Sequence, residues 1–297
     1  MKKLFSMVIT LMILTVFLNI IDFNSVISNI KNAKTNYFVF AILMSIFWPI
    51  LGFFRWKCIL YAFDYKPLDF YIIRSILISF SANLMIPGKG GDFSKAYTIS
   101  TNQRSKFILP LIIERLGDVF VLVLISIVGS IYLNEINFLL SSSLILLLMI
   151  ILILSLPLLF KVKIFKTKFI ILNNLIKNLH KITDIFKNKS NYLFFAMFFS
   201  FLNWLLASVQ IWFFFKAYNV NIDLVSILMM FPIAILLSLI PITPGGIGVR
   251  ESLFFVLFSK FASIETCIIV SLNYYFFSVA LLGFIGLIFF YKFINAR

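Results

Sequence analysis

Two glycine-rich, charged stretches hold the residues of this sequence that are best suited to binding chemistry. Each opens with Pro-Gly, continues through further glycines and then places a carboxylate beside a basic residue. Glycines let the backbone approach a ligand closely, and amides at the start of a helix attract phosphate. The two stretches, 87–95 and 244–251, suggest an internal repeat. The glycines that could contact an anionic group are Gly88, Gly90 and Gly91 in the first stretch, and Gly245, Gly246 and Gly248 in the second.

The charged side chains of these stretches extend that chemistry. Lys89, Lys95 and Arg250 can contact phosphate or carboxylate groups through charge-assisted hydrogen bonds. Asp92 and Glu251 could hold those basic groups in place or bind a cationic amine. A simpler alternative is that both stretches are ordinary turns, because Pro-Gly pairs are common turn signals.

A third charged motif, formed by Glu114, Arg115 and Asp118, lies inside an otherwise apolar run at 107–133. The spacing of four places both carboxylates on one helical face, and Arg115 can reach Asp118 three residues on. Charges in such a run usually line a bundle interior or a pathway, or else form a buried structural ion pair. Because one arginine cannot neutralise two carboxylates, a further cationic partner is expected. The candidates are Lys89, Lys95 and Arg74.

The composition places these motifs in a membrane. Of the 297 residues, 62% are hydrophobic and 12% are charged, whereas about half the residues of a soluble domain are apolar. The length allows about eight segments of ~20 residues and no sizeable soluble domain. We predict an all-α integral membrane protein with a single transmembrane domain over residues 1–297. The apolar runs lie at about 4–21, 37–56, 68–86, 107–133, 138–160, 192–216, 222–243 and 264–291.

The net charge of +15 could indicate nucleic-acid binding, but the lysines lie in loops between apolar runs. That pattern is typical of topology determinants and of contacts with anionic lipid, so we expect membrane lipids and no nucleic acid as partners. Cys58, Cys267 and His180 show no metal-binding spacing. We therefore expect neither a metal nor a cofactor, and no catalytic residue stands out.

The basic residues also decide between two topologies. If all eight runs crossed the membrane with the N-terminus inside, the loop 161–190 with its eight lysines would lie outside, against the positive-inside tendency. If the third and seventh runs enter and turn back, most basic residues fall inside. We therefore predict about six full spans and two re-entrant segments in the inner membrane, with both termini cytoplasmic. The first run, after Lys2 and Lys3, is interpreted as an uncleaved span.

In this topology the two Pro-Gly stretches enter from opposite faces, as in the inverted repeats of many transporters. The repeat elements lie around 68–133 and 222–291. The loop 161–190 carries apolar residues at helical spacing with lysines between them, which predicts an amphipathic helix on the cytoplasmic leaflet. This helix could gather anionic lipid, or it could be a solvated loop that only sets topology.

Together the three motifs resemble the lysylphosphatidylglycerol synthase transmembrane-region family, which includes the flippase portion of the multiple peptide resistance factor. The similarity extends over nearly the whole chain. In the first motif Lys89 and Asp92 stand where the family more often has Arg and Glu, which keeps the charge but loses a bidentate guanidinium. The matching residues are Pro87, Gly88, Lys89, Gly91 and Asp92; then Glu114, Arg115 and Asp118; then Pro244, Gly245, Gly246, Gly248 and Glu251.

The resemblance implies a flippase-like translocase for a lipid with a charged headgroup, such as an aminoacyl- or anionic phospholipid or a polyprenyl-phosphate-linked sugar. Because this sequence lacks the soluble synthase domain, we do not expect lysylphosphatidylglycerol synthesis, and an enzyme is the less favoured interpretation. The alternatives are a membrane-embedded lipid-modifying transferase and a non-catalytic partner of a cell-envelope lipid enzyme. The expected substrate-binding residues are Lys89, Asp92, Lys95, Glu114, Arg115, Asp118, Arg250 and Glu251.

Overall fold

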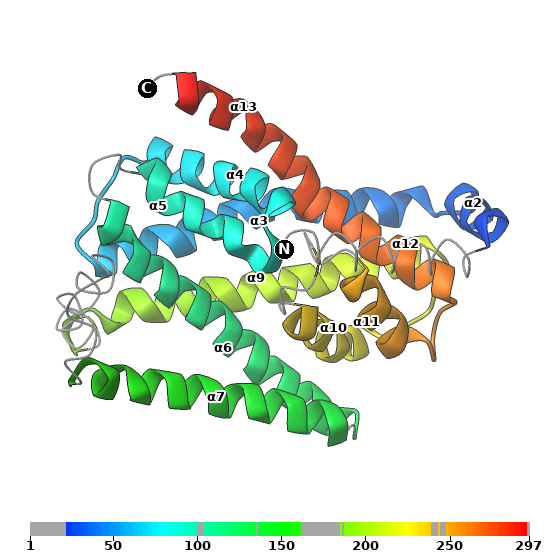
Figure 1. Cartoon of the computed structure of the whole chain (residues 1–297). Helices are drawn as coiled ribbons and strands as arrows, with labels where there is room; N and C mark the ends of the chain where they lie inside the picture. The colour runs from blue at the N-terminus through cyan, green and yellow to red at the C-terminus, as the bar shows by residue number, and fades with distance from the viewer. Residues whose placement is uncertain are drawn as a thin grey trace.

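Two antiparallel helices, α3 (Thr35–Ala62) and α9 (Ser190–Ala217), pack along each other at the centre of the protein in this computed structural model (Figure 1). Both are continuous, mainly apolar helices of 28 residues. Each is followed closely by a residue in the left-handed conformation, Asp64 after α3 and Asn219 after α9. A left-handed residue is a common stop signal for a helix.

The structure describes residues 22–99, 104–134, 136–161, 185, 187–238, 243 and 248–295. The predicted first span at 4–21, most of the loop 161–190, and Gly245 and Gly246 lie outside them. Within these ranges every regular element is helical, as the sequence predicts. Three of the described helices are long and apolar enough to cross a membrane: α3, α9 and the continuous helix Ile264–Tyr291. The protein is a multi-pass membrane protein.

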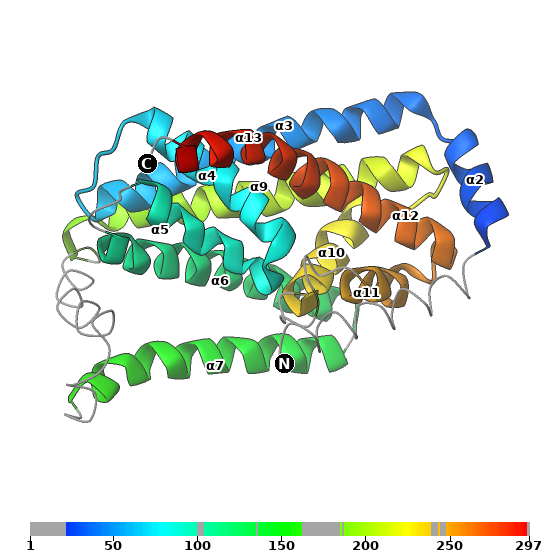
Figure 2. The same cartoon turned by 45° about the horizontal axis from the view of Figure 1, so that its top comes forward.

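The third apolar run does not continue as one straight helix. α4 (Asp69–Met85) leads into a 3₁₀ turn, η1 (Pro87–Phe93), and then into α5 (Ser94–Ile99), and these elements form the first hairpin. At Gly91 a Cβ atom would lie 2.3 Å from the backbone nitrogen of Asn83, so only glycine fits against α4 there. Because α5 packs back along α4, the hairpin begins and ends at the same end of the bundle (Figures 1 and 2).

The second hairpin lies at the opposite end of the bundle (Figures 1 and 2). It consists of α10 (Leu224–Ser238) and α11 (Val249–Phe258), which pack against each other. α11 begins after Gly248, whose φ of 89° favours glycine. The Gly248 amide donates to the Glu251 carboxylate, so Glu251 satisfies a donor that the helix start would otherwise leave unpaired.

The remaining helices surround this framework. α6 (Ile108–Tyr132) follows the first hairpin, and α7 (Ile136–Lys161) packs on its outer side. A short helix, α2 (Phe23–Lys31), contacts the start of the last helix. That last helix is continuous and consists of α12 (Ile264–Tyr275), a π-helical turn η5 (Phe276–Ala280) and α13 (Leu281–Asn295).

The two hairpins pack reciprocally. The first helix of each packs against the long helix that follows the other hairpin: α4 against α13, and α10 against α6. Glycines allow both crossings. A Cβ atom at Gly286 of α13 would lie 2.0 Å from the Leu77 carbonyl oxygen of α4, and one at Gly129 of α6 would lie 2.5 Å from the Met229 carbonyl oxygen of α10.

Corresponding helices of the two halves start at a nearly constant separation along the chain. The left-handed residues Asp64 and Asn219 are 155 residues apart. The same separation of 155 holds for the helix starts Thr35 and Ser190, Asp69 and Leu224, and Ser94 and Val249, and it is 156 for Ile108 and Ile264.

Candidate functional site

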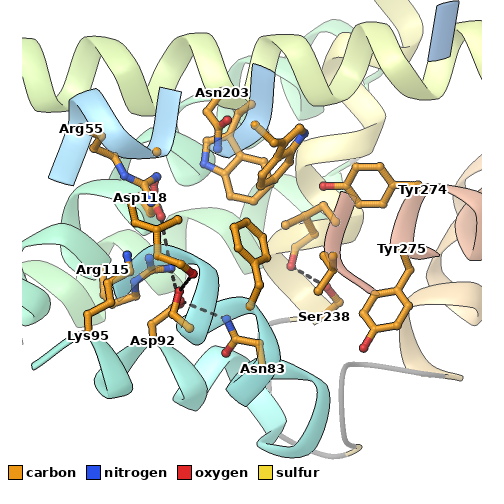
Figure 3. Close-up of a pocket in the computed structure, with 18 of the residues that line it drawn as sticks. Arg55, Asn83, Asp92, Lys95, Arg115, Asp118, Asn203, Ser238, Tyr274 and Tyr275 are labelled. Carbon is orange, nitrogen blue, oxygen red and sulfur yellow. Dashed lines mark hydrogen bonds and ion pairs between the residues drawn. The ribbon is translucent and has the colours of Figure 1, made fainter. Parts of the chain in front are cut away.

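Six charged residues from α3, η1, α5 and α6 meet inside the bundle beside the first hairpin. Figure 3 labels all of them except Glu114. Five of them are buried, and the sixth, Arg115, has a side chain that is 23% exposed. We call this group the charge cluster; its members are Arg55, Asp92, Lys95, Glu114, Arg115 and Asp118.

Glu114 is the centre of the charge cluster and is 1% exposed. Its Oε1 accepts hydrogen bonds from Arg55 Nη2 at 2.8 Å and from Lys95 Nζ at 2.9 Å. Lys95 also donates to Oε2 at 3.0 Å, and its Nζ lies 5.2 Å from the centre of the Trp56 ring. Of the three candidate partners, Lys89, Lys95 and Arg74, it is Lys95 that pairs with Glu114 in the described structure. Arg74 donates instead to the carbonyl oxygen of Thr98, which joins α4 to α5.

Arg115 connects the first hairpin to α6. Its Nη1 lies 3.0 Å from Asp92 Oδ2 and 3.3 Å from Asp118 Oδ2, the second contact being the predicted pairing three residues apart. Asn83 Nδ2 of α4 donates to the other oxygen of Asp92 at 3.0 Å. The ion pair between Asp92 and Arg115 therefore holds the turn of the first hairpin against α6.

Arg55 connects three helices. Its Nη1 donates to Asp118 Oδ1 at 2.5 Å, and Ser200 of α9 donates to the same oxygen at 2.7 Å. The charge cluster holds three cations and three carboxylates, so its formal charges balance. Buried charges are tolerated only when such partners are complete, and removing one member leaves another uncompensated.

A second polar group lies at the start of α11. Arg250 is 5% exposed, and its Nη2 donates to Glu251 Oε1 at 2.6 Å. Ser271 of α12 accepts from Arg250 Nε at 3.0 Å and donates to Glu251 Oε1 at 2.9 Å. The guanidinium of Arg250 lies 4.5 Å from the centre of the Tyr275 ring, a cation–π distance.

A group of neutral side chains lies 155 residues along the chain from Arg55 and Ser45. Gln210 is 155 residues after Arg55, and Ser200 is 155 residues after Ser45. Gln210 Nε2 of α9 donates to Ser45 Oγ of α3 at 2.7 Å, and Gln210 Oε1 accepts from Ser278 Oγ at 2.9 Å. Gln210 therefore bridges α9 to α3 and to the last helix through neutral hydrogen bonds, whereas Arg55 makes its contacts through charged ones.

We expect Ser45→Ala to destabilise the protein by about 0.6 kcal/mol, because it removes one interhelical hydrogen bond within a membrane bundle. Unfolding of the purified protein in mixed micelles measures this change. Ser143→Ala, at an exposed position on α7, is the matched control and should leave the unfolding midpoint unchanged. Equal effects of the two substitutions would contradict a stabilising role for the Gln210 bridge.

A cavity of about 120 Å³ connects the charge cluster with the Arg250 group. This volume is enough for several water molecules or a small polar group. In Figure 3 the labelled charged side chains lie on one side of it and Tyr274 and Tyr275 on the other, with Asn203 above and Asn83 below. The walls also include aromatic and aliphatic residues: Trp48, Ile76, Phe80, Trp204, Ile235 and Val279.

The structure brings most of the predicted site residues together. Asp92, Lys95, Arg115, Asp118 and Arg250 line the cavity, while Glu114 and Glu251 lie directly behind them as their ion-pair partners. The backbone of Gly88, Lys89 and Gly90 belongs to η1, but the Lys89 side chain lies outside the described part of the structure. Gly245 and Gly246 are not described either. Across the described residues, no set of three His, Cys, Asp or Glu side chains is placed to hold a metal ion.

Arg55 is the important site residue that the sequence alone does not reveal. It lies near the end of an apolar run beside Lys57, where basic residues normally mark the membrane boundary, and we therefore count it as a topology residue from sequence. In the structure α3 continues to Ala62, which places Arg55 inside the helix with its side chain buried. The sequence signal that could have pointed to Arg55 is that Glu114 and Asp118 need more positive charge than Arg115 alone supplies.

The family model described as the lysylphosphatidylglycerol synthase TM region matches residues 3–286. The chain belongs to this family. No curated protein matches it. The match to the lysylphosphatidylglycerol synthase TM region includes all described cavity residues, so the charge cluster and the cavity lie within the domain that defines the family.

Proposed function

We propose that this protein binds the charged headgroup of a membrane lipid in its central cavity and moves that headgroup between the two leaflets. The observation that carries the proposal is a cavity with charged walls inside a bundle of membrane-crossing helices. Buried charges in such a bundle are costly and usually mark a substrate path. The acyl chains would stay in the lipid phase while the headgroup passes between the hairpins.

We further propose that the two hairpins are re-entrant segments of an inverted repeat. Three features support this architecture: the hairpins start from opposite ends of the bundle, their helices begin about 155 residues apart, and each packs against the helix that follows the other. In such repeats alternating access follows when one half moves against the other around a fixed site. The contact between Asp92 and Arg115 would then hold the first hairpin closed.

The orientation belongs to the same proposal. Lys66, Lys106 and Lys189 precede α4, α6 and α9 at one end of the bundle, which favours that end as the cytoplasmic one. Both termini would then be cytoplasmic and the protein would reside in the inner membrane. The basic loop 161–190 would lie against the anionic lipids of the cytoplasmic leaflet.

Liposomes that contain the purified protein test translocation directly. With a headgroup-labelled anionic phospholipid in both leaflets, externally added dithionite should reduce the inner-leaflet label only when the protein is present. The double variant Asp92→Asn with Arg115→Gln removes the ion pair that joins the first hairpin to α6, together with the Arg115 contacts to Glu114 and Asp118. It leaves the net charge unchanged and should abolish this activity. The matched control, Lys57→Gln with Asp69→Asn, removes an exposed ion pair and should retain it. An intact protein that moves no lipid would refute the proposal.

Cysteine labelling tests the re-entrant topology. In a variant without Cys58 and Cys267, a membrane-impermeant maleimide should label cysteines on either side of the first hairpin from the cytoplasm only. Cysteines on either side of the second hairpin should be labelled from the outside only. If all apolar runs crossed, each pair would be labelled from opposite sides. The exposed positions to use are Lys66→Cys with Lys106→Cys, and Asn221→Cys with Lys260→Cys.

A further inference from the structure

We propose that the headgroup bound in the cavity is a phosphate anion that also carries hydroxyl groups, and not a cationic aminoacyl group. This inference rests on the proposed function and narrows its substrate class. It follows from which hydrogen-bonding groups around the cavity are already occupied and which still lack a partner.

The carboxylates are already held by cations and hydrogen-bond donors, so a cationic ligand would have to compete with these partners. Both oxygens of each of the four acids have a hydrogen-bond or ion-pair partner in the described structure. Asp92 is held by Asn83 and Arg115, and Glu114 by Arg55, Lys95 and Arg115. Asp118 is held by Arg55, Ser200 and Arg115. Glu251 is held by Arg250, Ser271 and the Gly248 amide.

Several hydrogen-bond donors that face the cavity have no acceptor among the described residues. In the part of the chain that the structure describes, Arg250 uses Nε and Nη2, and no acceptor contacts its Nη1. Arg115 Nε and Trp48 Nε1 are buried and have no partner among the described residues. All three residues line the cavity. Buried polar groups are normally satisfied, so a ligand at this site is expected to supply acceptors with negative charge.

Two neutral acceptors complete the pattern. Asn83 donates its amide nitrogen to Asp92, which leaves Asn83 Oδ1 buried and unpaired among the described residues, and Asn203 Oδ1 is in the same state. Both asparagines line the cavity. Amide oxygens accept hydrogen bonds from hydroxyl groups, as a glycerol or sugar substituent on the phosphate would supply. Surplus guanidinium and indole donors together with amide acceptors therefore fit a polyol phosphate.

Binding of defined lipids to the full-length protein in a neutral detergent tests this inference by native mass spectrometry. The probes are phosphatidylglycerol, phosphatidylmethanol as an anion without hydroxyls, zwitterionic phosphatidylcholine, and cationic lysylphosphatidylglycerol. We expect phosphatidylglycerol to bind most tightly, with phosphatidylmethanol second. Equal or tighter binding of the cationic lipid would overturn the inference.

Arg250→Gln should weaken phosphatidylglycerol binding about tenfold, the loss expected for one charge-assisted hydrogen bond. Lys260→Gln removes the same charge from an exposed turn that follows the other end of α11 and should change the affinity less than about twofold. If Arg250→Gln alone does not fold, Arg250→Gln with Glu251→Gln removes the pair together and should show the same loss. Unchanged affinity in either variant would overturn the inference.

Free glycerol phosphate distinguishes a lipid from a soluble ligand. It should compete with phosphatidylglycerol only weakly, because it lacks the acyl chains; competition at equal concentration would assign the phosphate site to a soluble ligand and overturn the lipid source. The translocation assay separates the two proposals. Lipid movement without anion preference would refute only this inference, and anion-selective binding without lipid movement would refute only the proposed function.

Discussion

Replacing Arg55 with methionine is expected to destabilise the protein by about 3–5 kcal/mol, because it leaves buried carboxylates without one of their partners. Arg55 donates to Glu114 and to Asp118, and both acids are buried. Methionine keeps most of the side-chain volume, so the expected loss reflects charge and hydrogen bonding rather than a cavity. The fraction unfolded against increasing sodium dodecyl sulfate in mixed micelles measures the effect.

Lys57→Met is the matched control on the same helix. Lys57 is also ion-paired, with Asp69, but the side chains of that pair are 26% and 54% exposed. Water and salt screen such a pair, so its loss should leave the unfolding midpoint almost unchanged. If Arg55→Met and Lys57→Met behaved alike, the charge cluster would not be a buried network.

A compensating substitution shows that charge balance is the cause. After Arg55→Met the cluster has one carboxylate more than it has cations. Adding Asp118→Asn restores the balance while Ser200 can still donate to the side chain at that position. The double variant should therefore be more stable than Arg55→Met alone. A double variant that is less stable than the single one would show that the hydrogen bonds of Asp118, and not its charge, determine the outcome.

The sequence predicts the helical class and much of the site because those features depend on local patterns. Apolar runs predict the long helices, and the i,i+3 spacing correctly pairs Arg115 with Asp118. The excess of carboxylates on α6 also predicts a further cationic partner, which the sequence limits to Lys89, Lys95 or Arg74 and the structure identifies as Lys95. The ion pairs around α6 can therefore be predicted from residue spacing and from the free-energy cost of an unpaired buried charge.

Other features depend on packing between distant segments, which no local pattern encodes. Arg55 enters the site because α3 continues past its apolar run and packs beside α6 and α9. The stretch 87–95, expected to be a glycine-rich loop, forms the 3₁₀ turn η1 and the start of α5 because Gly91 lies directly on α4. In the sequence the proposed repeat rests on the two Pro-Gly motifs alone, whereas in the structure four pairs of helix starts share a separation of 155 or 156 residues.

Alanine at Gly129 or Gly286 is expected to destabilise the protein by about 1–3 kcal/mol at each site, because the added methyl group must displace a helix. At Gly286 the new Cβ would lie 2.0 Å from the Leu77 carbonyl oxygen, and at Gly129 2.5 Å from the Met229 carbonyl oxygen. Both obstacles are backbone atoms, which cannot rotate away as a side chain can. Either substitution should therefore push the first helix of one hairpin off its partner and also reduce lipid movement.

Gly117→Ala provides the control because it makes the same substitution on the same helix as Gly129. A Cβ atom at Gly117 would meet nothing within 4 Å, so the change should stabilise α6 by up to about 1 kcal/mol through the higher helix propensity of alanine. Opposite signs at Gly117 and Gly129 would show that the contact, and not the loss of a glycine, sets the cost. Similar losses at Gly129 and Gly286 would show that both crossings are under the same steric constraint, as two halves related by an inverted repeat require. If Gly129→Ala left the stability unchanged while Gly286→Ala lowered it, only the α4–α13 crossing would be tightly packed. That result would contradict equal packing at the two crossings.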